Sequence, residues 1–210
     1  MHLLRFAAGL LAWPLAVQSA LAGQAYDELY RLYDYPKTLG RSAVPVCFHH
    51  GCESVKQVRL TDEHWNRLAG YFTPAAANPA DEREQIRQAV AEMERITGVL
   101  AGTAGDRAGD LASFGTLEPQ MDCIDESSNT TTYLTLFEQA QLLRWHSVEP
   151  RATRGYLFFG GWPHYTALIH DRQTGEPWVV DSWFRDNGEL PDVVDLATWK
   201  DGWKPEGFRF

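Results

Sequence analysis

The chain has 210 residues, of which 44% are hydrophobic and eight are Trp, and its formal net charge at neutral pH is −9. This composition is enough to form the core of one domain and is short for two. The negative balance argues against nucleic acids and anionic membrane surfaces as partners, because both carry phosphate charges of the same sign.

The N-terminal segment has the pattern of a cleaved secretory signal. Arg5 precedes an apolar stretch over residues 6–17, and the small-residue exit Ala20-Leu21-Ala22 follows. The apolar stretch is shorter than the roughly 20 residues that a membrane-spanning helix needs. We therefore expect a signal peptide over residues 1–22 and a single mature domain over residues 23–210, which is periplasmic or secreted and has no stable membrane insertion. The alternative is an uncleaved anchor.

Three cysteines divide into a close pair and a single thiol. Cys47 and Cys52 enclose a short loop, and a disulfide between them suits an oxidising exported compartment. The alternative is a small metal site that also uses His49 and His50, although one short loop would be strained by closing a tetrahedron of ligands. Cys123 is then unpaired and must stay buried, pair with another chain or react.

Apolar periodicity predicts two helices in the first half of the chain. Thr61 can cap the first, whose Trp65, Leu68 and Phe72 fall on one face. The second covers residues 81–101 and carries charges on its other face, which we expect to be solvated. The Gly-, Ala- and Asp-rich stretch that follows, residues 102–118, is predicted to be a loop over the site.

A central helix and a set of strands are predicted next. The helix covers residues 124–144 and opens with a Ser- and Thr-rich run of poor helix formers, which burial would have to hold in place. The strands that follow are expected to form an antiparallel meander, which gives an α+β fold with the helices first. The predicted strands are residues 43–48, 54–60, 145–148, 155–159, 164–170 and 178–184.

Counting along the last hairpin brings two side chains to one sheet face. If residues 172–175 form a four-residue loop, His164 lies opposite Trp183 and Thr166 lies opposite Asp181. His164 and Asp181 are then diagonal neighbours on the same face, whereas a loop of odd length would separate them.

Cys123, His164 and Asp181 occur in the order of a nucleophile, its base and the group that orients the base. A thiol reacts as a thiolate, which a helix N-terminus and a nearby imidazolium favour. The imidazole can take up the proton and return it to a leaving group, while the carboxylate fixes the tautomer of the ring. The backbone N–H of Cys123 would stabilise the oxyanion that forms on an acyl carbon. This chemistry implies hydrolysis or acyl transfer.

The sequence resembles the transglutaminase-like branch of the papain-type cysteine enzymes, which includes bacterial periplasmic cysteine proteinases. The resemblance covers residues 121–184 and implies a papain/transglutaminase-like core in which a helix bearing the cysteine packs on an antiparallel sheet. It implies catalytic roles for Cys123, His164 and Asp181, a protein or peptide substrate and no required cofactor. Some bacterial members with an Asp-Cys-x-Asp motif bind calcium, so calcium is a candidate ligand, for which no residues are assigned. The resemblance rests on Asp122-Cys123-Ile124-Asp125, Pro163-His164-Tyr165-Thr166-Ala167 and Val180-Asp181-Ser182-Trp183.

Acidic neighbours of the thiol depart from what a reactive cysteine needs. Asp122, Asp125 and Glu126 should raise the pKa of Cys123 unless they point away from it or are neutralised. The simplest role for Asp122 or Asp125 is to cap the helix that starts there, and Glu126 can bond its first turn.

Two functions are consistent with the sequence. The first is an exported cysteine hydrolase or acyltransferase that acts on an amide bond of a protein, peptide or cell-wall peptide. The second is a non-catalytic periplasmic binding domain with the same fold, in which Cys123 serves only for packing. Candidates for the walls of a substrate cleft are Trp162, Trp183 and Asn129.

Overall fold

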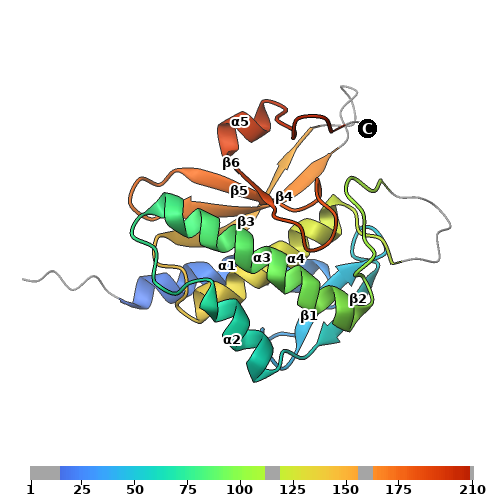
Figure 1. Ribbon diagram of the computed structural model, residues 1–210, viewed down its shortest axis with the longest axis horizontal. Coiled ribbons are helices and arrows are strands. Elements are labelled where there is room, and N and C mark those ends of the chain that lie inside the picture. The colour runs from blue at the N-terminus through green and yellow to red at the C-terminus, as the bar shows by residue number, and fades with distance from the viewer. Residues whose placement is uncertain (1–14, 112–118, 156–162, 209–210) are drawn as a thin grey trace, which may run out of the picture.

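The structure is a computed structural model that describes residues 15–111, 119–155 and 163–208. Within these ranges the fold is α+β, with five helices and two antiparallel sheets (Figure 1). The helices are α1 (Leu15–Leu32), α2 (Asp62–Gly70), α3 (Pro79–Ala101), α4 (Cys123–Gln139) and α5 (Leu196–Lys200). The strands are β1 (Val44–Phe48), β2 (Ser54–Val58), β3 (His146–Arg154), β4 (His164–Asp171), β5 (Pro177–Asp181) and β6 (Asp192–Asp195).

Helix α4 is the central element of the fold. It contacts β3, β4 and β5 of the larger sheet, β1 of the smaller sheet and the helices α1 and α3. All but Ile124 and Gln139 of its 17 residues are buried. Its Ser- and Thr-rich opening is buried as well, and hydroxyl groups there bond to carbonyls of the preceding turn, as Ser128 does to Ile124 at 2.6 Å. Burial therefore holds the helix where propensity alone would not, as the sequence predicted.

The larger sheet is an antiparallel meander in the order β3-β4-β5-β6. An antiparallel meander after the central helix was predicted, but its last strand, β6, was not. The predicted register of the last hairpin is also confirmed. Ala167 of β4 pairs with Val180 of β5, and Asp171 donates its N–H to the carbonyl of Glu176 across the turn. This register makes His164 and Asp181 neighbours at one end of the two strands.

Several elements differ from the predicted ones. Helix α1 runs through residue 22, the expected cleavage position, and beyond it Tyr26 and Leu29 are buried in the main core. Strand β3 continues past the predicted end at residue 148, because a register shift between Glu149 and Ala152 accommodates the proline between them. The predicted strand over residues 155–159 falls largely outside the described residues, and the predicted strand over residues 178–184 ends at Asp181.

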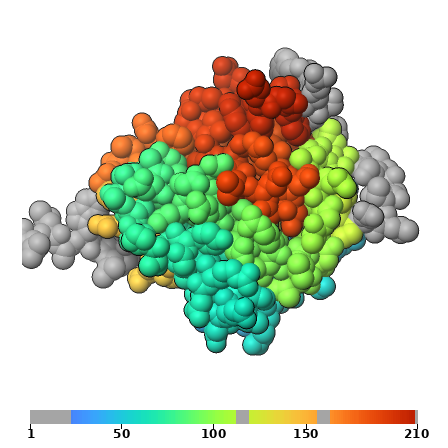
Figure 2. Space-filling model, in the orientation of Figure 1, coloured from blue at the N-terminus to red at the C-terminus, as the bar shows by residue number. Residues whose placement is uncertain are grey.

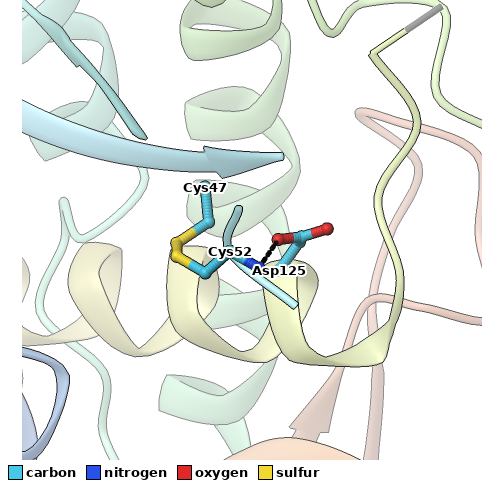
Figure 3. Close-up of side chains that lie close together, drawn as sticks. All are labelled: Cys47, Cys52 and Asp125. Atoms are coloured by element: carbon cyan, nitrogen blue, oxygen red, sulfur yellow. Dashed lines mark hydrogen bonds between the residues drawn. A yellow bond between two sulfur atoms is a disulfide. The ribbon is translucent and has the colours of Figure 1, made fainter. Parts of the chain in front are cut away.

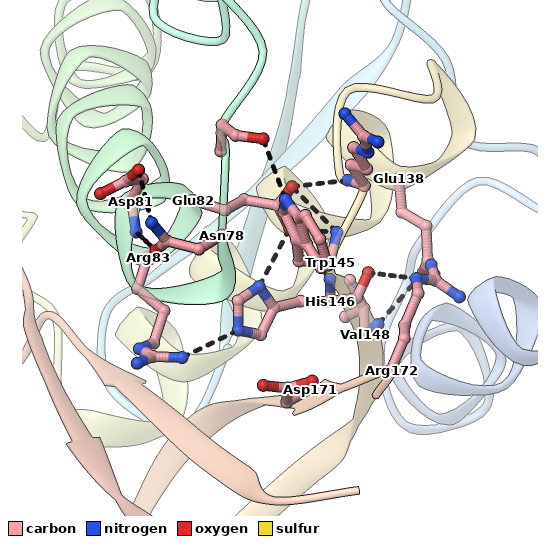
Figure 4. A network of polar contacts seen from close by, with 12 residues as sticks. Asn78, Asp81, Glu82, Arg83, Glu138, Trp145, His146, Val148, Asp171 and Arg172 are labelled. Atoms are coloured by element: carbon pink, nitrogen blue, oxygen red, sulfur yellow. Dashed lines mark hydrogen bonds and ion pairs between the residues drawn. The ribbon is translucent and has the colours of Figure 1, made fainter. Parts of the chain in front are cut away.

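A buried carboxylate joins α3 to the beginning of β3. Glu82 is 1% exposed and accepts hydrogen bonds from the backbone N–H groups of Arg144, Trp145 and His146, at 2.6 to 3.0 Å. The ring of His146 lies 2.9 Å from the same carboxylate and is flanked on its other side by Arg83 (Figure 4). This network fixes the position of the N-terminal part of α3 relative to the sheet.

The C-terminal segment packs against α3 on the face that Figure 2 shows, where α3 is green and the segment is orange to red. Arg87 of α3 donates to the carbonyl of Pro191, and Gly188 donates its N–H to Glu94 of α3. Across the described part of the chain, no helix combines the length and the apolar character needed to cross a membrane.

Candidate active site

The first turn of α4 places Cys123 at the helix N-terminus. Asp122 is the N-cap, and one oxygen of its carboxylate accepts the N–H groups of Ile124 and Asp125 at 2.9 and 3.0 Å. Asp125 accepts the N–H of Asp122 in return, at 3.1 Å, which completes a capping box. The predicted capping role is therefore confirmed, and both aspartates take part in it.

A disulfide joins Cys47 to Cys52, as predicted, and the loop that it closes, residues 47–52, is called the disulfide loop below. The loop lies on the N-terminal end of α4 (Figure 3). Gly51 donates its N–H to the second oxygen of Asp122 at 3.0 Å, and Cys52 donates its N–H to Asp125 at 2.7 Å. Both carboxyl groups beside the thiol are thus engaged by backbone donors.

The side chain of Asn129, on α4, binds the backbone of the disulfide loop. Its side-chain oxygen accepts the N–H of Cys47 at 2.7 Å, and its side-chain N–H₂ donates to the carbonyl of Cys47 at 2.9 Å. The residue is 2% exposed, so it braces the loop and does not line an open cleft wall. Of the other cleft candidates, Trp162 lies outside the described residues, and Trp183 is buried next to His164.

The disulfide loop also brings together three side chains of types that bind metals. The sulfur atoms of Cys47 and Cys52 and a carboxylate oxygen of Asp125 lie within 4.8 Å of one another. The two sulfur atoms are bonded to each other, so neither offers the thiolate that a metal would need. His49 and His50 bond elsewhere, to Ser54 and Asp110.

His164 and Asp181 form a buried pair at the open end of the β4–β5 hairpin. The Nε2 atom of His164 lies 2.8 Å from Oδ2 of Asp181, which confirms the predicted contact. The imidazole is enclosed by three aromatic rings, those of Trp183, Phe184 and Trp199, with centroids 4.8, 5.2 and 5.5 Å away. The Nδ1 atom is buried and has no hydrogen-bond partner among the described residues.

The sulfur of Cys123 lies against the backbone on both sides of His164. It donates to the carbonyl of Pro163, at 3.8 Å, and the backbone N–H of Tyr165 bonds to it. Cys123 also packs in one apolar cluster with Trp183 and Phe184, two of the rings that enclose His164. The three predicted catalytic residues are therefore brought together, although the thiol is hydrogen-bonded to Pro163 and not to Nδ1 of His164.

Burial dominates the electrostatics of the thiol. Cys123 is 4% exposed, and burial raises the pKa of its thiol to about 12. The N–H of Tyr165 lowers this pKa, whereas the charges of Asp122, Asp181 and Asp125 raise it. The predicted effect of the acidic neighbours is thus present, but it is smaller than that of burial. At neutral pH the thiol of this closed site is protonated.

Three buried acids lie behind the first turn of α4. They come from three segments, Glu94 from α3, Asp106 from the loop after α3 and Glu126 from α4, and they are called the acid cluster below. The side chains of Glu126 and Asp106 interact with each other, and Asp106 accepts the N–H of Met121 at 2.6 Å. Burial raises the pKa of both Glu94 and Asp106 to about 7 and that of Glu126 well above its ordinary value. The charged face of α3 that we expected to be solvated is therefore partly buried.

Two features of the site were not predicted. Trp199 donates its indole N–H to Oδ2 of Asp181 at 2.8 Å, and it lies beyond the segment that carries the family resemblance. The acid cluster depends on segments 12 to 32 residues apart, and a Glu on a helix has no sequence signal for burial.

Comparisons with protein-family models, with curated proteins and with solved structures found no match.

Proposed function

We propose that this protein is a thiol-dependent hydrolase or acyltransferase that acts on an amide bond of a protein, peptide or cell-wall peptide. Cys123 is the nucleophile, His164 the general base and acid, and Asp181 the group that orients the imidazole. The observation that supports the proposal most directly is the state of His164. Asp181 holds its Nε2, while its Nδ1 is buried and has no hydrogen-bond partner within the part of the chain that the structure describes. Both chain neighbours of His164 contact the sulfur of Cys123.

The proposed reaction begins with the transfer of the thiol proton to Nδ1 of His164. The high pKa of Cys123 means that its thiolate has to form by this internal transfer, because loss of the proton to water at neutral pH is unfavourable. The sulfur then attacks the amide carbon, and negative charge develops on the carbonyl oxygen near the N-terminus of α4. The imidazolium returns the proton to the leaving amine, and water or a second amine releases the acyl group from the sulfur.

A papain/transglutaminase-like core is part of this proposal. It is supported by a buried helix that begins at the cysteine and packs on an antiparallel meander, whose adjacent strands carry the histidine and the aspartate. Export is supported by the signal-like N-terminal segment and by the disulfide. Calcium remains a candidate ligand through the resemblance, and we assign no residues to it.

A non-catalytic binding domain is the second candidate, and two observations favour it. Cys123 is almost inaccessible, and its thiol has no hydrogen bond to the imidazole. A lone buried cysteine with a raised pKa is the usual state of a structural, inert thiol.

Alkylation of the folded protein by iodoacetamide separates the two candidates. Cys123 is the free cysteine of the chain, so a Cys123→Ala variant gives the background. If the protein is the proposed enzyme, Cys123 is labelled in the folded state at pH 7 and His164→Gln slows the labelling at least tenfold. His170→Gln is the matched control, because His170 is half-exposed and faces Glu149, outside the site. Labelling that requires denaturant, or that is indifferent to His164, would establish the binding domain.

A further inference from the structure

Trp199 contacts the same oxygen of Asp181 that His164 contacts, and its ring lies beside the imidazole, with the two centroids 5.5 Å apart. Its indole Nε1–H and the Nε2 atom of His164 both lie 2.8 Å from Oδ2 of Asp181. Trp199 is 0% exposed and Asp181 is 1% exposed, so water does not compete for this oxygen. One carboxylate oxygen thus contacts two groups, an imidazole that can take up or release a proton and an indole N–H that can only donate a hydrogen bond.

The segment that carries Trp199 is anchored to the strand that carries Asp181. Strand β6 pairs with β5, and Asp192 lies opposite Asp181 in this register. Helix α5 follows β6 directly, and its N-cap, Asp195, accepts the N–H of Thr198 at 2.9 Å. The indole therefore reaches Asp181 from an element whose position the sheet itself determines.

Arg154 contacts both the ring and the backbone of Trp199. The guanidinium carbon lies 4.4 Å from the centre of the Trp199 ring, and the guanidinium also donates to the backbone carbonyl of Trp199. In β3, Arg154 pairs with His164 of β4, and the charge of Asp181 acts on its guanidinium. Arg154, Trp199, Asp181 and His164 are thus linked by successive contacts.

We propose that Trp199 is a positioning residue that fixes the Asp181 carboxylate and, through it, keeps the proton of neutral His164 on Nε2. A carboxylate held by a second donor presents its oxygen to the imidazole in one orientation, and this selects the tautomer whose Nδ1 is free to accept a proton. The inference rests on the proposed function for its catalytic meaning, since Nδ1 is the atom that would receive the proton of Cys123. The contact itself is independent of any reaction.

The test compares Trp199→Phe, which removes the N–H and keeps an aromatic ring, with Trp178→Phe as the matched control. Trp178 lies on the same strand as Asp181, but its indole nitrogen has no hydrogen-bond partner among the described residues and its ring stacks on Arg83. The first readout is the tautomer of His164 from ¹⁵N NMR of its ring, assigned by loss of the signal in His164→Gln. The second is the rate of Cys123 alkylation at pH 7.

Trp199→Phe is expected to reduce the population of the Nε2–H tautomer and to slow alkylation about tenfold, the size expected for one hydrogen bond to a charged group. Trp178→Phe is expected to change neither. An unchanged tautomer in Trp199→Phe overturns the inference, whether or not Cys123 reacts. If the wild-type thiol is inert, the proposed function fails, and the tautomer alone then decides whether Trp199 positions the pair. Should Trp199→Phe not fold, Arg154→Met, which removes the cation behind the indole, is expected to shift the tautomer in the same direction, and an unchanged tautomer there overturns the inference.

Discussion

The side chain of Asn129 makes two hydrogen bonds to the backbone of Cys47, one to its N–H at 2.7 Å and one to its carbonyl at 2.9 Å. The two residues are 82 positions apart, and both are buried. The disulfide loop supplies the N–H donors for Asp122 and Asp125, so these two bonds from Asn129 connect α4 to the loop that covers its first turn.

Asn129→Ala should therefore destabilise the fold, because it leaves a buried N–H and a buried carbonyl of Cys47 without partners. The expected loss in the free energy of unfolding is about 3 kcal/mol, measured by urea denaturation. Asn66→Ala, on the exposed face of α2, serves as the control and should change little. A loss below about 1 kcal/mol in Asn129→Ala would show that these two bonds contribute no more than an ordinary surface contact.

Reduction of the disulfide is expected to loosen the same loop. Closing a loop of this length contributes about 2 kcal/mol by restricting the unfolded chain. In the folded protein the amide protons of Gly51 and Cys52 are bonded to Asp122 and Asp125, so they should exchange slowly with solvent. The double variant Cys47→Ala/Cys52→Ala should speed their exchange at least tenfold in hydrogen-exchange NMR. Equal exchange with and without the disulfide would mean that the two carboxylates hold the loop by themselves.

The acid cluster predicts that stability falls as the pH rises. In the unfolded chain these acids titrate near pH ~4, whereas in the folded protein the pKa of Glu94 and of Asp106 is about 7 and that of Glu126 is higher still. The folded state therefore binds more protons between these values, and the free energy of unfolding decreases as the pH rises through that window. The neighbouring charge of Arg95 opposes the effect at Glu94, and that of Asp110 adds to it at Asp106.

Glu126→Gln tests this prediction, because the amide has nearly the same shape as the acid but has no proton to lose. The urea concentration at the midpoint of unfolding should decrease for the wild type as the pH is raised from 5 to 8. It should decrease less for the variant. Glu53→Gln, at an exposed position, should retain the wild-type slope. If the curves of wild type and Glu126→Gln are parallel, the buried acids do not control the pH dependence.

Spacing along the sequence predicted much of this site. The residues that it did not predict have one feature in common, which is that distant segments create their environment. The register of His164 and Asp181 follows from counting along one short hairpin, and the pairing of the two nearest cysteines follows from their separation. Trp199 and Glu94 could not be placed in this way, because their environment is created by segments that pack on them from elsewhere. Glu94 is buried because Gly188, 94 residues away, lies over it, and Trp199 reaches Asp181 only after β6 has paired with β5. Helical periodicity distinguishes the two faces of α3, but it does not predict which loop will cover the charged one.

The buried carboxylate of Glu82 accepts more hydrogen bonds than an amide in its place could accept. Its carboxylate receives three backbone N–H groups, from residues 144–146 at the entry to β3, and lies 2.9 Å from the ring of His146. In Glu82→Gln one oxygen becomes a donor that faces other donors, so at least one buried N–H loses its partner. The expected loss is about 3 kcal/mol in the free energy of unfolding. Glu84→Gln, two residues along the same helix but half-exposed, is the matched control and should stay within about 0.5 kcal/mol of the wild type. Equal stability of the two variants would mean that His146 and the backbone amides find other acceptors when the carboxylate is absent.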